Sequence, residues 1–201
     1  MSNTICFTDS GYDNSPSYSS ISGGYRNTIS GYGSHNSISG GYGNTASFAY
    51  CGFIGSVTEN ILGGYNNNIS GGRNNNISST SAYRSISGGW CNTISGDYNT
   101  GMNIISGGRD NNLSGSCNTI SGGHGNTASG KGVVVSGGAT NSTDGKYNTI
   151  YGGYGGSASG EFNVIAGGAS NSVAPTGGCY NTCLLYTSDA ADEGLGVDLG
   201  G

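Results

Sequence analysis

The chain has 201 residues with a formal net charge of −5, and 42 of them are glycine. Glycine does not recur at every third position, which excludes a collagen triple helix, and no apolar run is long enough to span a membrane. The six basic residues are scattered, so their spacing gives no basic stripe for nucleic acid.

Residues 1–20 precede the regular part of the chain. They show neither a basic n-region nor an apolar h-region, so no signal peptide is visible. We expect residues 1–20 to form a lead-in or a partial coil, ahead of a repeat domain over residues 21–182.

A phrase of the form Ser-Gly-Gly-x-x-Asn recurs through residues 21–182, and an aliphatic residue directly precedes each copy. From Ile105 onward the copies are evenly spaced. Self-similarity at a fixed short period predicts a solenoid. The strict copies begin at Ser22, Ser39, Ser70, Ser87, Ser106, Ser121 and Ser136, and relaxed copies begin at Leu62, Tyr151 and Ala166.

Each period contains two aliphatic positions, usually within the pattern Asn-Thr-Ile-Ser-Gly. Neighbouring strand residues point to opposite faces, so an inward Ile places the flanking Thr and Ser outward. The fold class is therefore all-β: a parallel β-solenoid, or β-roll, with about 15 residues and two short strands per coil. The first predicted column is Ile21, Ile38, Ile61, Ile69, Ile86, Ile105, Ile120, Val135, Ile150 and Ile165; the second is Ile29, Ala46, Ile54, Ile77, Ile94, Leu113, Ala128, Thr143, Ala158 and Val173.

Asparagine recurs two residues before these aliphatic positions. Asn tolerates left-handed backbone and bonds to nearby backbone groups, so we expect it at turn exits. Stacked coils would also set the amides above one another in a hydrogen-bonded ladder. The members are Asn27, Asn44, Asn75, Asn92, Asn111, Asn126, Asn141 and Asn171 in one column, and Asn36, Asn118, Asn148 and Asn163 in the other.

Three stretches break the period, at residues 48–53, 80–84 and 97–103. We expect them to bulge from the rod as loops, where binding specificity commonly lies.

The residue after each Gly-Gly varies, and most of its occupants are aromatic or cationic. One interpretation is an exposed or interchain aromatic ladder that covers thin coils. The other is a surface that binds a glycan or a protein partner, because rigid aromatic rings and Arg supply contact energy. The ligand-contact candidates are Tyr25, Tyr42, Tyr65, Arg73, Trp90, Arg109, His124 and Tyr154; Ala139 and Ala169 occupy the remaining positions.

A second hypothesis concerns the outward Thr-x-Ser pairs around the inward residues, such as Thr28 with Ser30 and Thr127 with Ser129. A flat array of hydroxyl and methyl groups is typical of an ice-binding solenoid. Asn68, Asn76, Ser85, Asn112 and Val134 interrupt the array.

No catalytic constellation is visible in this sequence. Glycosidase activity would need a paired-carboxylate cleft, and no acidic residues pair at the spacing of adjacent coils. A near-match to a P-loop at residues 125–131 has Gly132 where Ser or Thr is required. We therefore expect no enzyme, no cofactor and no metal, and Cys6, Cys51, Cys91, Cys117 and Cys179 give no disulfide framework because their number is odd and their spacing irregular.

Residues 183–201, at the end of the chain, depart from the repeat. They resemble the conceptual translation of a sequencing adapter, so we expect a non-native, disordered tail there. Four of the acidic residues lie in it: Asp189, Asp192, Glu193 and Asp198. Without them seven acidic residues remain against six basic ones, and the acidic balance says nothing about partners.

The phrases at residues 118–123 and 126–130 resemble the YadA-like, haemagglutinin-type head repeats of trimeric autotransporter adhesins and related fibre proteins. The resemblance covers residues 21–182. It implies a left-handed β-roll, three chains side by side as a homotrimer, and an extracellular binding role. The chain differs in having one bulky inward residue followed by Gly-Gly, and it shows no neck, stalk or membrane anchor.

These features together predict a non-enzymatic fibre or adhesin head, extracellular, at a cell surface or on a virion. It would recognise a host or cell-surface glycan or protein through turn residues on a rigid rod, with avidity compensating for weak single contacts. An ice-binding solenoid or a purely structural fibre is the alternative. No nucleic acid is expected as a partner, and no membrane segment is expected in this stretch.

Overall fold

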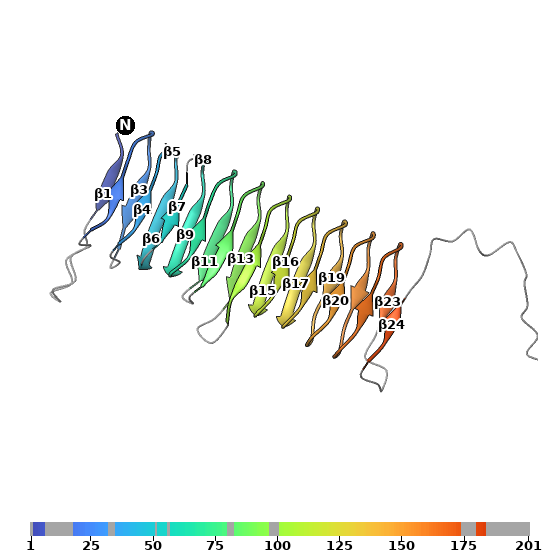
Figure 1. Ribbon diagram of the computed structural model, residues 1–201. Coiled ribbons are helices and arrows are strands. Elements are labelled where there is room, and N and C mark those ends of the chain that lie inside the picture. The colour runs from blue at the N-terminus through green and yellow to red at the C-terminus, as the bar shows by residue number, and fades with distance from the viewer. Residues whose placement is uncertain are drawn as a thin grey trace, which may run out of the picture.

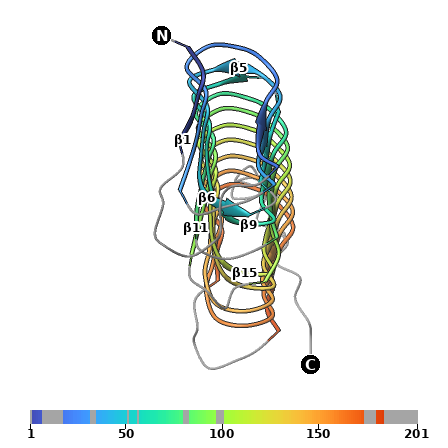
Figure 2. The same cartoon turned by 90° about the vertical axis from the view of Figure 1, so that its left-hand side faces the viewer.

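The computed structural model describes residues 2–6, 18–31, 35–50, 52–55, 57–79, 83–96, 101–173 and 180–183. Within these ranges the chain is all-β and forms a parallel β-solenoid, which confirms the predicted fold class. Successive coils stack side by side into a rod (Figure 1). Viewed along the rod, each coil is a flattened loop with two long sides and two narrow edges (Figure 2).

One long side is an 11-stranded sheet that starts with β1 and is here called the β1 sheet. Its strands are β1 (Thr4–Cys6), β3 (Thr28–Ser30), β6 (Thr45–Tyr50), β9 (Ile61–Tyr65), β11 (Asn76–Ser79), β13 (Thr93–Gly96), β15 (Asn112–Ser116), β17 (Thr127–Lys131), β19 (Ser142–Thr143), β21 (Ser157–Ala158) and β23 (Ser172–Val173).

The other long side, the β2 sheet, also has 11 strands. They are β2 (Ser20–Ile21), β4 (Ser37–Ile38), β7 (Phe53–Ile54), β10 (Asn68–Ile69), β12 (Arg84–Ile86), β14 (Asn103–Ile105), β16 (Thr119–Ile120), β18 (Val134–Val135), β20 (Thr149–Ile150), β22 (Val164–Ile165) and β24 (Thr182–Cys183). A small third sheet pairs β5 (Gly41–Tyr42) with β8 (Val57–Thr58) at one narrow edge.

The core is a double column of aliphatic side chains between the two sheets. Ile105 pairs with Ile120 in the β2 sheet, and Leu113 pairs with Ala128 in the β1 sheet, so each coil in this part has the predicted length and contributes one strand to each sheet. Ile120 and Leu113 are fully buried. Each such side chain stabilises the fold by about 1.5–3 kcal/mol relative to exposure.

The predicted columns were wrong in one place. Ile54 belongs to the first column, because it pairs with Ile38 and Ile69 in the β2 sheet. Leu62, not Ile61, fills the second column beside Ala46, and Ile61 points outward. The cause is that strands must alternate between sheets, so the Gly-Gly after Leu62 lies within strand β9 and is not a true copy of the repeat.

All three predicted loops are partly strand, and the third, residues 97–103, ends with the first residue of β14. Residues 48–50 belong to β6, which pairs with β9 through a register shift between Ala46 and Ala49, and Phe53 opens β7. Arg84 opens β12 with a buried side chain, in register with Asn103. Residues 51, 80–82 and 97–100 lie outside the described residues.

The predicted asparagine ladder is confirmed. Asn126 is buried, and its Oδ1 accepts a hydrogen bond from the Asn141 backbone N–H at 3.0 Å. Its Nδ2 donates to the Gly122 and Gly138 carbonyls at 3.0 and 3.1 Å. The amides therefore satisfy buried backbone groups both within a coil and between coils, which a purely aliphatic core could not do.

The expectation of left-handed backbone at these Asn residues was wrong. The positive φ belongs to the residue directly before each ladder Asn, such as Asp110 (54°) and Thr140 (54°). The ladder residues Asn111 and Asn141 that follow them do not have a positive φ. The preceding residue makes the turn, and the Asn that follows points inward.

Three of the cysteines, Cys91, Cys117 and Cys183, are free thiols, and Cys51 and Cys179 lie outside the described residues. Cys183 pairs with Ile165 in β24, at the position where the repeat predicts an aliphatic residue, and residues 184–201 lie outside the described residues. The left-handed coil and the three-chain assembly stay predictions.

Candidate functional site

The candidate site is the narrow edge where the chain passes from the β2 sheet to the β1 sheet, here called the Gly-Gly edge. Its shape depends on the second glycine: Gly123 has a φ of +86°, and a Cβ there would lie 2.2 Å from the Gly138 carbonyl oxygen. With no side chain at that position, coils stack closely and each presents its next residue outward. Parallel bridges join those residues into one column: Tyr25, Tyr42, Thr58, Arg73, Trp90, Arg109, His124, Ala139, Tyr154 and Ala169.

Seven of the eight predicted contact residues lie in this column, and Tyr65 does not. Thr58 takes its place, between Tyr42 and Arg73. Tyr65 ends β9 and pairs with Tyr50, so it lies at the other narrow edge, here called the opposite edge. The out-of-phase Gly-Gly before Tyr65 explains the wrong assignment.

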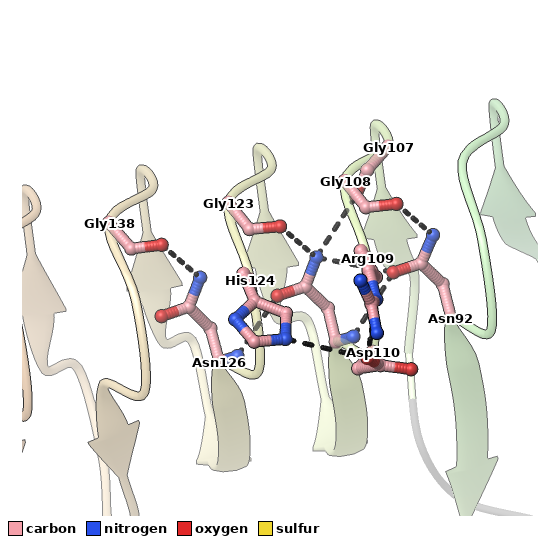
Figure 3. A network of polar contacts seen from close by, with 10 residues as sticks. Asn92, Gly107, Gly108, Arg109, Asp110, Gly123, His124, Asn126 and Gly138 are labelled. Atoms are coloured by element: carbon pink, nitrogen blue, oxygen red, sulfur yellow. Dashed lines mark hydrogen bonds and ion pairs between the residues drawn. The ribbon is translucent and has the colours of Figure 1, made fainter.

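The middle of the Gly-Gly edge carries a cluster of four side chains, and Figure 3 shows three of them: Arg109, Asp110 and His124. The Arg109 guanidinium lies over the Trp90 ring, 4.7 Å from its centroid. Arg109 Nε donates to Asp110 Oδ2 at 2.9 Å, and the same oxygen lies 3.4 Å from His124 Nε2. Trp90 is 44 % exposed and the Arg109 side chain 57 % exposed. These exposed groups are therefore held in place by one another, although surface ion pairs add little to stability.

A second cluster lies nearer the N-terminus on the same edge. Tyr25 and Tyr42 stack with ring centroids 5.8 Å apart. Arg26 lies over both rings and donates from Nη1 to the Tyr42 hydroxyl at 2.7 Å. Both tyrosines remain about 40 % exposed, so the ring edges and the guanidinium are accessible together.

Arg73 and Tyr154 lie in the same column but take part in neither of these two clusters. Arg73 is exposed beside Trp90 and forms no ion pair within the described residues. Tyr154 is 62 % exposed and lies between Ala139 and Ala169, which are too small to cover its ring.

The opposite edge carries an aromatic ladder that was not predicted from the sequence. Tyr147, Phe162 and Tyr180 stack with centroids 5.1 and 5.0 Å apart. Each directly precedes an Asn of the other ladder, a signal that the sequence does contain. Beside it, Lys146 Nζ donates to Glu161 Oε1 at 2.6 Å, and this hydrogen bond and charge raise the pKa of Lys146.

Within the described ranges, no three His, Cys, Asp or Glu side chains gather closely enough to hold a metal ion. In the same part of the chain no helix has the length and apolar character needed to cross a membrane.

No protein-family model matches the sequence, and no curated protein matches it at a significant level.

Proposed function

We propose that this chain is the head of a non-enzymatic extracellular or virion fibre or adhesin, whose Gly-Gly edge recognises a surface glycan or protein. One observation carries the proposal: seven of the ten positions in the Gly-Gly edge column hold exposed aromatic or cationic side chains, and four of these, from Arg73 to His124, are consecutive. A turn position needs no ring for folding, as Ala139 and Ala169 demonstrate in the same column.

The energetics favour recognition over a structural role for this column. Trp, Tyr and Arg supply most of the energy at protein binding surfaces. The cation–π and ion-pair contacts around Arg109 and Arg26 fix their side chains before binding, which lowers the entropic cost of association. Contacts repeated along a rigid rod also reinforce one another by multivalency.

Replacing Tyr25, Tyr42 and Trp90 together by Ser should weaken binding at least about tenfold and leave the β-sheet content unchanged. The measurement is binding to a printed array of glycans and matrix proteins, with far-ultraviolet circular dichroism as the folding check. The matched control replaces three opposite-edge residues by Ser: Tyr65, Tyr147 and Tyr83, whose backbone N–H bonds to the Tyr65 carbonyl. Equal losses in both variants, or loss of the β signal, would contradict the proposal.

A three-chain assembly is part of the proposal. Its support is the outer column of the β2 sheet, which includes Phe53, Ile104, Val134 and Val164 beside polar residues. Apolar side chains on an outer face favour burial against another chain. Sedimentation analysis of the whole chain should therefore give about three times the 20.0 kDa monomer mass. A monomer at micromolar concentration would contradict the three-chain assembly.

Ice binding is the second candidate, and one observation favours it. Thr4, Thr28 and Thr45 occupy consecutive, in-register outward positions of the β1 sheet. Ile61 and Asn76 follow them in the same column and end the regular array. Thermal hysteresis measured on the whole chain distinguishes the two candidates, because only an ice-binding surface would produce it.

A further inference from the structure

We propose that the ligand of the Gly-Gly edge is an acidic glycan, a proposal that rests on the recognition role of this edge. Its carboxylate or sulfate groups bind to Arg73 and Arg109, and its sugar rings contact Trp90 between them. The three residues occupy consecutive positions in the column.

The basic side chains are unevenly placed, and this favours an anionic ligand. Arg26, Arg73 and Arg109 lie on the Gly-Gly edge, whose described acidic residues are Glu59 and Asp110. On the opposite edge Lys131 and Lys146 face an equal number of described acidic residues, Asp144 and Glu161. Arg84 is buried. The Gly-Gly edge therefore has the excess of positive charge, although the chain as a whole is acidic.

Arg109 is prepared for a bidentate contact. Its Nε is engaged by Asp110 and one face of its guanidinium lies against Trp90. Within the described residues its two terminal Nη groups have no hydrogen-bond partner, and those groups form the fork that matches a carboxylate or sulfate. The Asp110 carboxylate offsets the Arg109 charge, so Arg109 contributes its hydrogen-bonding fork and the net positive charge of the site comes from Arg73.

Arg73 supplies the uncompensated charge of the pair. It lies on the other side of Trp90 from Arg109 and forms no ion pair in the described part of the chain. Adjacent strands are about 4.8 Å apart, so the two arginine positions lie roughly 10 Å apart along the rod. That separation is comparable to a disaccharide, so a glycan with an acidic group on alternate sugars would engage both arginines and place a sugar ring at Trp90.

The test compares two double variants of the full chain that remove the same charge. The probes are immobilised sulfated heparin oligosaccharides, carboxylated polygalacturonate and neutral dextran, read by biolayer interferometry. Replacing Arg73 and Arg109 by Ala should weaken binding to an acidic probe by about tenfold to a hundredfold, because each side chain makes charge-assisted hydrogen bonds. Replacing Lys131 and Lys146 by Ala should change it less than about twofold.

The Lys form of the same pair, Arg73→Lys with Arg109→Lys, should give an intermediate loss, since it keeps the charge and removes the fork. The sulfated and carboxylated arms identify which acidic group binds. If replacing Arg73 and Arg109 by Ala and replacing Lys131 and Lys146 by Ala weaken binding equally, the proposal is overturned, because binding would then follow net charge. A Trp90→Ser variant completes the test. If it loses binding only to dextran, or only to the proteins of the printed array, the acidic ligand is overturned and the recognition role stays intact. If its binding to every probe is unchanged, both proposals are overturned.

Discussion

Replacing Gly89 by Ala should destabilise the rod by about 4 kcal/mol, whereas the same replacement at the neighbouring Gly88 should be nearly neutral. Gly89 has a φ of +90°, and a Cβ there would lie 2.1 Å from the Gly108 carbonyl oxygen and 2.6 Å from Asn92 Nδ2. A left-handed backbone costs an L-residue about 1–2 kcal/mol, and forcing extra atoms into packed structure costs about 1–3 kcal/mol more. The two coils would have to separate at a point where Trp90 N–H bonds to the Gly108 carbonyl.

Gly88 is the matched control within the same Gly-Gly pair. A Cβ at Gly88 meets nothing within 4 Å, and its φ lies outside the left-handed region. Ala there should leave stability unchanged or raise it by about 0.5 kcal/mol, through lower entropy of the unfolded chain. Chemical denaturation of both variants measures the difference. Similar midpoints would show that the second glycine is not required for close stacking of the coils.

The sequence predicts the fold well where the period is strict and poorly where it is not. Beyond Ile105 the constant spacing places the predicted aliphatic columns correctly, because one residue of slip would expose a whole strand face, although Val133, buried at an asparagine position, was missed. Between Ala46 and Ile69 the coils differ in length, and the Gly-Gly at residues 63–64 lies in a strand, whereas the next one, at residues 71–72, lies in a turn. Local pattern could not decide between Ile61 and Leu62 there. Counting strands alternately from each side of the irregular stretch would have done so.

Much the same holds for the candidate site. The column after Gly-Gly can be read from the sequence because each of its members occupies a fixed repeat position, and its single wrong member, Tyr65, follows the single out-of-phase phrase. The contacts between members could not be predicted. That Arg109 folds over Trp90 while sharing Asp110 with His124 depends on side-chain directions in adjacent coils, and periodicity does not specify those. Arg84 was missed because it occupies an asparagine position without being asparagine.

Asn126→Ala should destabilise the rod by about 3 kcal/mol, because one buried amide serves several backbone groups. The replacement leaves the Asn141 backbone N–H without its acceptor and the Gly122 carbonyl without its side-chain donor, while the Gly138 carbonyl keeps the bond from the His124 N–H and loses its second one. Each buried group left unpaired costs about 1–3 kcal/mol. The lower part of that range applies, because the chain itself tolerates a ladder position without an amide. Gly156 occupies such a position, and its backbone N–H still bonds to Asn141 Oδ1 at 2.8 Å.

Asn126→Asp separates hydrogen bonding from packing, since the two side chains have nearly the same shape. The carboxylate accepts only, so it would face the Gly122 and Gly138 carbonyls with like partial charge inside a buried site. Leaving a buried charge unpaired costs about 3–5 kcal/mol, so this variant should be no more stable than Asn126→Ala at neutral pH. Thr127→Ala, one residue further and pointing outward, should change stability by less than about 0.5 kcal/mol. If Asn126→Asp retained wild-type stability, the ladder would contribute through shape alone; the loss of stability expected here requires that its amide hydrogens hold adjacent coils together.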